Sequence, residues 1–231
     1  MFDAAIEADP ENAQAYAWKA CTLGQAMVRG FVNKPMQEIM PEFSNLMSNA
    51  LSIDPNDFEC HRLQCAVNTM MGDMKAALEH GKKAYDVNPN DPRILQQYGE
   101  VLLKMGKTEE GCDLTLLALE YDPIAQGQTN SDKRKSDGVF GCVLDDRPDV
   151  GLDIASGMID RSEKVLVYSA ALAVGSAGSL KNFSWLTDDL KNSDFEQIEA
   201  AIEEMGKFDV VVQSKLKEVF LDHILPLREA A

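Results

Sequence analysis

The chain has 231 residues, of which 45% are apolar and 26% are charged, and its formal net charge at pH 7 is −16. This length and composition are typical of a soluble globular protein with one large or two small domains. The acidic excess argues against a nucleic-acid partner, because binding to phosphates requires clustered lysine and arginine. The one dense basic run, residues 133–135, is flanked by aspartates, and we interpret it as part of a solvated loop.

No apolar run approaches the roughly 20 residues that are needed to cross a bilayer. The first residues are acidic and amphipathic, which is unlike a signal peptide. The cysteines form an odd, scattered set, which is typical of unpaired and mostly buried thiols in a reducing cytoplasm. They are Cys21, Cys60, Cys65, Cys112 and Cys142. We therefore expect a cytoplasmic protein without a membrane partner.

A fixed period organises the first half of the chain. Pro55, Pro89 and Pro123 stand 34 residues apart, and an alanine lies five residues before each of them and before Pro10. A recurrence of this kind indicates an array of stacked repeats, and 34 residues is a length typical of a helix–turn–helix unit.

The first two units are irregular. Residues 2–10 match the end of a unit's second helix, so the chain begins in mid-repeat and we expect it to be part of a longer protein. The next unit, from Pro10 to Pro55, has 45 residues, 11 more than the period. We place the insertion near residues 28–37, where it should lengthen the loop or the helices. A first helix should contain Tyr16, and a second should cover residues 41–52.

The following two units are regular. Apolar spacing predicts helices at residues 58–71 and 74–86 in one unit, and at residues 93–105 and 108–120 in the next. Gly72 and Gly106, also 34 residues apart, separate the two helices of each unit. Thr108 is a plausible N-cap of the last helix. Each unit closes at its proline, because proline cannot continue a helix interior.

These units resemble the tetratricopeptide (TPR) repeat family. Small residues, an aromatic and the closing proline occupy the family's positions in two repeats: Tyr98, Gly99, Gly106, Ala118 and Pro123, and before them Gly72, Ala77, Ala84 and Pro89. Departures are His61 and Leu95 in place of the leading aromatic, and Cys65 in place of the first glycine. The resemblance covers residues 2–123. It implies an all-α fold in which TPR-like helix–turn–helix repeats form a right-handed α-α superhelix.

A looser resemblance concerns the context of the repeats. Residues 50–57 and 99–102 are similar to the C-terminal TPR regions of bacterial multidomain signalling proteins such as class III nucleotidyl cyclases. This resemblance implies a non-catalytic interaction or scaffold module that forms the regulatory part of a larger bacterial protein.

The period fails after Pro123. Residues 126–138 read as a polar loop, and helical patterning then resumes in five segments: residues 149–159, 162–174, 180–190, 194–205 and 210–225. Ser193 and Glu196 have the spacing of a capping box, and Pro226 should stop the last helix. We interpret residues 1–125 as the TPR repeats, 126–138 as a loop, and 139–231 as degenerate repeats that cap the array.

The sequence contains none of the usual catalytic motifs. The histidines His61, His80 and His223 are expected to be isolated from one another. A metal at Cys60, His61 and Cys65 is disfavoured, because five residues along a helix turn the two thiols roughly 140° apart. We therefore expect no enzyme, no metal and no cofactor.

The expected partner is a protein or peptide, bound in a groove lined by the first helix of each repeat. The side chains predicted to face this groove are Gln14, Glu59, Arg62, Arg93, Gln96 and Glu100. The alternatives are a solvated helix face, a homodimerisation surface, or a helical domain that binds a small effector or a substrate. Capture of a chaperone's acidic tail is disfavoured, because among the positions of that clamp only Arg93 has a matching side chain.

Overall fold

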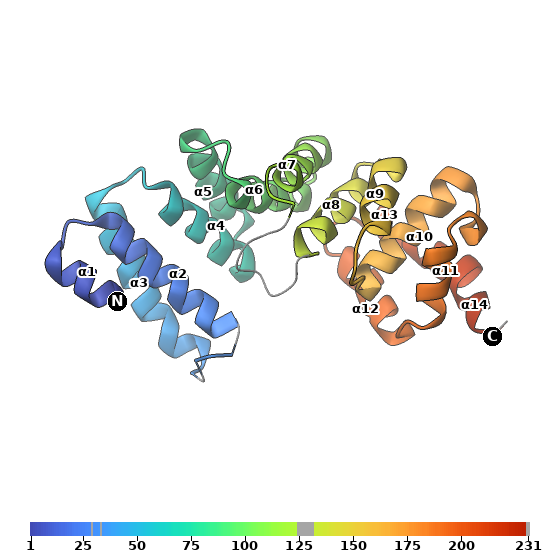
Figure 1. Cartoon of the computed structure of the whole chain (residues 1–231), viewed down its shortest axis with the longest axis horizontal. Coiled ribbons are helices and arrows are strands. Elements are labelled where there is room, and N and C mark those ends of the chain that lie inside the picture. Colours follow the sequence, from blue (N-terminus) through green and yellow to red (C-terminus); the bar gives the residue numbers. More distant parts are fainter. Residues whose placement is uncertain (29, 33, 124–131, 230–231) are drawn as a thin grey trace. The chain divides into compact units, whose positions relative to one another are not determined.

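The structure is a computed structural model that describes residues 1–28, 30–32, 34–123 and 132–229 (Figure 1). Within these residues every regular element is a helix, and no strand occurs. The prediction of an all-α fold is therefore confirmed. The chain divides into two compact units, Met1–Tyr98 and Gly99–Ala231, and the division falls inside helix α6 (Pro92–Lys104).

The first unit contains helix pairs joined by short connections, and α6 begins in it. Its earlier helices are α1 (Phe2–Ala8), α2 (Ala13–Val28), α3 (Met36–Ile53), α4 (Phe58–Met71) and α5 (Met74–Val87). Helix α4 packs on α5, and α2 packs on α3. The predicted helices of the two regular units agree with α4, α5, α6 and α7 (Thr108–Tyr121) to within one residue at each end.

Local side-chain bonds explain why the α4–α5 pair begins and ends where it does. The Asp57 carboxylate accepts a hydrogen bond of 2.7 Å from the Cys60 amide and caps α4, and Asp73 caps α5 in the same way. Gly72 ends α4 with a φ of 78°, which glycine adopts without the penalty that a Cβ brings. Two residues thus suffice to reverse the chain. Thr108, by contrast, is the first residue of α7 and makes no cap bond.

The insertion in the repeat between Pro10 and Pro55 lengthens both helices of that repeat and the loop between them. Helix α2 has 16 residues and α3 has 18, whereas α4 and α5 have 14 each. Helix α3 begins at Met36, five residues before the predicted start at residue 41, and Pro41 lies inside it. The prediction of a helix start at this proline was wrong: Pro41 is the sixth residue of α3, so it removes the one N–H that would donate to the Gln37 carbonyl, and the helix continues through it.

Glycines allow the closest helix contacts. A Cβ added to Gly81 would lie 2.7 Å from Cδ2 of Tyr98, and a Cβ added to Gly111 would lie 2.8 Å from the backbone nitrogen of Leu103. Both distances are shorter than a methyl group tolerates. The small residues at these positions are therefore required by packing.

The second unit continues the helical pattern around a larger core. Its helices after α7 are α8 (Lys133–Leu144), α9 (Pro148–Ser156), α10 (Glu163–Ala177), α11 (Ser184–Lys191), α12 (Phe195–Met205), α13 (Val210–Val219) and α14 (Leu225–Glu229), with a short 3₁₀ turn, η1 (Leu180–Asn182), and a π segment, η2 (Phe220–Ile224). Helix α10 packs against α8, α9, α12 and α13 and buries most of its side chains. Its apolar character on all sides is thereby explained.

Several boundaries of the second unit differ from the predictions: α9 ends at Ser156 rather than at residue 159, α10 runs to Ala177 rather than to residue 174, and the segment expected at residues 180–190 is divided into η1 and α11. Residues 133–138, expected in a loop, form the start of α8, because Arg134 is buried against Asp122 and Lys133 forms an ion pair with Asp137 one turn further on. Residues 126–131 lie outside the described part of the chain. Asp194 rather than Ser193 caps α12, since the Ser193 hydroxyl donates to the Leu190 carbonyl at 2.7 Å.

The prediction that Pro226 stops the last helix was also wrong. Helix α13, the π segment η2 and α14 follow one another without a break, and the Leu225 N–H donates to the Phe220 carbonyl, five residues back. Pro226 therefore lies directly after a π segment, where the regular i→i−4 ladder is already interrupted, and the helix runs to Glu229.

Candidate functional site

Polar side chains from three first helices form one connected network in the first unit. Gln14 of α2 donates from Nε2 to a carboxylate oxygen of Asp57, the residue that caps α4. The indole Nε1 of Trp18 donates to Oε1 of Gln14 at 3.1 Å. The Arg93 guanidinium of α6 lies over the Trp18 ring, 5.6 Å from its centre. Helices α2, α4 and α6 are thereby joined through polar side chains.

A buried carboxylate holds the two arginines of the network. Glu59 is fully buried and accepts from Nε of Arg62 at 3.2 Å, and its other neighbour is Nη2 of Arg93, at 3.3 Å. Arg93 also donates to the Asp91 carboxylate at 2.6 Å. Burial alone would raise the pKa of Asp91, but its bonds from Arg93 outweigh burial and lower that pKa. The same bond raises the pKa of Arg93, so both groups stay charged.

The six residues predicted to face a groove have different surroundings. Gln14, Glu59, Arg62 and Arg93 belong to the network, in which Arg93 is 39% exposed and Arg62 is more buried. Gln96 is only 8% exposed, and Glu59 is fully buried, so neither presents its side chain to solvent. Glu100 belongs to the second unit, where it pairs with Lys104 at 2.5 Å.

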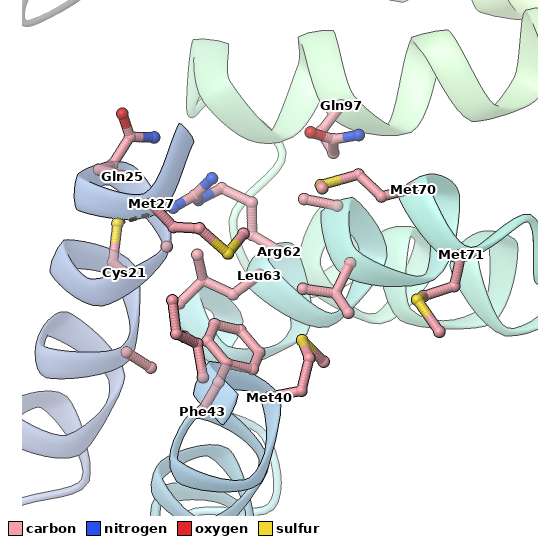
Figure 2. A pocket seen from close by; sticks show the side chains of 15 residues that line it. Cys21, Gln25, Met27, Met40, Phe43, Arg62, Leu63, Met70, Met71 and Gln97 are labelled. Carbon is pink, nitrogen blue, oxygen red and sulfur yellow. Dashed lines mark hydrogen bonds between the residues drawn. The ribbon is translucent and has the colours of Figure 1, made fainter. Parts of the chain in front are cut away.

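An apolar pocket of about 220 Å³ adjoins this network. Helices α2, α3, α4 and α6 contribute to its walls, and Figure 2 shows the side chains that converge on it. Four methionines contribute to the lining, together with aromatic and aliphatic side chains: Met27, Met40, Met70, Met71, Ile39, Phe43, Leu63 and Val67. Arg62 and Gln97 are polar members of the lining. The sequence analysis did not find this pocket.

Met70 and Met71 are strongly exposed, at 60% and 65%. Exposed large apolar side chains that gather at a pocket are a mark of an interaction site. In the sequence, Met70, Met71 and Met74 indicate either an adaptable binding surface or, more readily, helix-core filling, and the exposure of Met70 and Met71 is against core filling.

The prediction that the three histidines are isolated was wrong. Nδ1 of His61 in α4 lies 2.9 Å from Nδ1 of His80 in α5, and Nε2 of His61 lies 3.0 Å from the Pro55 carbonyl oxygen. The two residues are 19 positions apart, so only the pairing of α4 with α5 brings them together. Burial lowers the pKa of both imidazoles.

The thiols are arranged as the sequence predicted. All five cysteines are unpaired, and four of them are buried, whereas Cys21 is partly exposed. Burial raises the pKa of the Cys21 thiol. Among the described residues, no group of three or more His, Cys, Asp or Glu side chains is arranged to hold a metal ion. None of the helices described is long and apolar enough to span a membrane.

A second, smaller pocket of about 160 Å³ lies in the second unit. Phe140, Tyr168 and Phe208 contribute aromatic rings to it, and Lys104 places its ammonium 5.3 Å from the centre of the Phe208 ring. Lysines and carboxylates alternate around the rings and pair with one another, as in the contact between Lys104 and Glu100. The net charge of this pocket is therefore small.

Comparisons with known proteins agree with this architecture. No protein-family model and no curated protein sequence matches the chain. Among solved structures, the TPR protein YrrB, described as having an unusual peptide-binding site, superposes with a TM-score of 0.60 at 14% identity, over 100% of this chain and 97% of that one. PilF of Pseudomonas aeruginosa gives 0.55 at 14% identity, over 89% and 96%.

A third structure is a TPR protein from Parabacteroides merdae, with a TM-score of 0.50 at 14% identity, over 99% of this chain and 79% of that one. Together these likenesses define the class of the fold. The chain has a TPR-like fold of helical repeats, as its 34-residue period predicts. They do not support the looser resemblance to nucleotidyl cyclases.

Proposed function

We propose that the chain is a non-catalytic interaction module that binds a protein or peptide segment along its first helices. The observation that carries this proposal is the network of Gln14, Glu59, Arg62 and Arg93, which joins three first helices and leaves Arg93 accessible. A network whose members hold one another in place presents its donors at little cost in conformational entropy. The peptide-binding site named for YrrB supports the same class of function.

The wider context is also part of the proposal. We infer that the module is the regulatory part of a larger bacterial signalling protein in the cytoplasm, as the sequence resemblance implies. Self-association into a homodimer is the alternative. Light scattering over a concentration series separates the two, because a homodimer gives a mass that rises with concentration whereas a peptide-binding module does not.

A displayed library of random peptides, panned on the purified chain, tests the proposal. Peptides selected by the wild type should bind the variant Arg93→Ala about tenfold more weakly, since an accessible charged donor is lost. The matched control is Lys82→Ala, which removes an exposed charged side chain that pairs with Asp86 on α5. A library that yields no peptide, or peptides that bind Arg93→Ala as well as the control, would contradict the proposal.

A further inference from the structure

The insertion builds the methionine-lined pocket. Counted from the preceding proline, α2 and α4 begin at the same point, but α2 is two residues longer and so includes Met27. Counted from the following proline, α3 begins four residues earlier than α5, and these four residues include Ile39. Met27 and Ile39 both line the pocket. A repeat of regular length would have neither of these walls.

The size and chemistry of the pocket suit one bulky apolar group. A cavity of about 150 Å³ holds a benzene ring, and this pocket has about 220 Å³. Methionine side chains are unbranched and adapt to different apolar shapes. Met40, Met70 and Met71 therefore provide walls that can close on a leucine, methionine or phenylalanine side chain (Figure 2).

The described lining of the pocket offers no unpaired charge to an anionic group. Arg62 is the one charged residue among the lining residues that the structure describes, and its guanidinium is held by the buried carboxylate of Glu59. It therefore offers no unpaired positive charge. The chain as a whole has a net charge of −16, which attracts cationic partners.

We propose that this pocket binds the bulky apolar side chain of a basic amphipathic segment in a partner protein. The inference rests on the proposed function and adds the anchor site and the chemistry of the partner. A helical segment with apolar residues on one face and lysines on the other satisfies both observations, since the apolar face enters the pocket and the lysines complement the net negative charge of the chain.

The probe is a synthetic amphipathic helix of leucine and lysine about 14 residues long, which is four helical turns. Binding is followed through the methyl resonances of the methionines. Met70 and Met71 should shift on titration, whereas Met158 and Met205, which are buried in the second unit, should not. A peptide of the same length made of leucine and glutamate should bind at least about tenfold more weakly.

Gly24 offers a matched pair of variants. It lines the pocket, and a Cβ added there meets only Cε2 of Phe43, at 4.0 Å. Gly24→Leu should fill the pocket and weaken binding of the leucine–lysine peptide about tenfold, the loss that follows when an apolar anchor is excluded. Gly24→Ala leaves most of the volume open and should bind within about twofold of the wild type. A thermal unfolding curve checks that both variants are folded.

An exposed position gives a second test that does not depend on filling the pocket. Met70→Ser should weaken binding, whereas Met105→Ser, which changes an exposed methionine outside the pocket, should not. Unchanged affinity of Gly24→Leu and Met70→Ser overturns the inference, and so does failure of the wild type to bind the peptide. Methyl shifts that depend on protein concentration without peptide would show a second copy in the pocket and overturn it too.

These outcomes separate the inference from the proposed function. If Arg93→Ala weakens binding of the random-library peptides and Gly24→Leu does not, the proposed function stands and the pocket is not part of the binding site.

Discussion

Acid should destabilise the first unit through the pair of His61 and His80. Nε2 of His61 lies 3.0 Å from the Pro55 carbonyl, so this nitrogen carries a hydrogen. In a neutral ring Nδ1 is then the acceptor, and Nδ1–H of His80 donates to it across 2.9 Å. Protonation of His61 puts a hydrogen on both facing nitrogens, and the bond between α4 and α5 is lost.

The direction of the effect follows from the pKa shifts. Burial lowers the pKa of both histidines, and the charge of Lys83 lowers both pKa values further. Asp54 and Asp57 raise the pKa of His61, and Glu79 raises the pKa of His80, but these effects are smaller than that of burial. The unfolded chain therefore takes up protons near pH 6.5, before the folded chain does. The stabilisation is complete above pH 6.5 and is lost as the pH falls through the folded-state pKa values.

The magnitude can be worked from the bond itself. One buried hydrogen bond contributes about 1 kcal/mol, and each unit of pKa depression corresponds to about 1.4 kcal/mol. We expect the free energy of unfolding to fall by roughly 1–2 kcal/mol between about pH 7.5 and pH 5 because of this pair. Carboxylates that titrate in the same pH range also change the free energy of unfolding. The difference between the wild type and a histidine variant removes their contribution.

Urea unfolding at several pH values, followed by circular dichroism, measures the effect. In the double variant His61→Gln/His80→Gln the fall between pH 7.5 and 5 should be smaller than in the wild type by about 1–2 kcal/mol. His223→Gln, which changes the histidine of the second unit, is the control for the loss of an imidazole outside the pair. Equal pH dependence of the double variant and the wild type would refute the reasoning.

Other predictions concern packing, charge and thiols. Gly111→Ala should lower the free energy of unfolding by about 1–2 kcal/mol, because its Cβ would meet backbone atoms that cannot move aside. Gly24→Ala should raise it by about 0.5–1 kcal/mol, since its Cβ has room and alanine favours the helix; urea titration measures both. Arg134→Met should lower the free energy of unfolding by about 1 kcal/mol in the same assay, because Asp122 loses its partner but is partly exposed and can be hydrated. In the native protein a thiol reagent should modify Cys21 slowly and spare the four buried cysteines, and mass spectrometry identifies the modified residue.

The sequence predicted the elements that depend on local chemistry. The helix boundaries predicted for the two regular repeats, residues 58–120, agree with the structure to within one residue. Gly72 and Gly106 end the first helix of each repeat, and a proline closes each repeat. Competition between neighbouring caps was harder to predict. Ser193 and Asp194 are both good caps, and the choice depends on the Ser193 hydroxyl, which is already bonded to the end of α11.

Four of the six residues predicted to face a groove, Gln14, Glu59, Arg62 and Arg93, belong to the polar network, and their role in binding a partner stays a prediction. Helical phase placed Gln14, Arg62 and Arg93 on the first helices. Glu59 joins the two arginines, and Trp18 joins Gln14 to Arg93. The position of a residue on a helix face does not show how deeply its side chain is buried, so the burial of Glu59 could not be predicted from the sequence. The pocket and the histidine pair depend on distances between helices, which no pattern within one helix contains.

The two-residue connection at Gly72 also has a consequence for the rate of folding. A helix pair joined through so short a link can form without closing a long loop, so little chain entropy opposes the search for its contacts. Proteins that are rich in such local contacts fold in microseconds to milliseconds. We expect the α4–α5 pair to form early, and the α2–α3 pair, with its longer connection, to form more slowly.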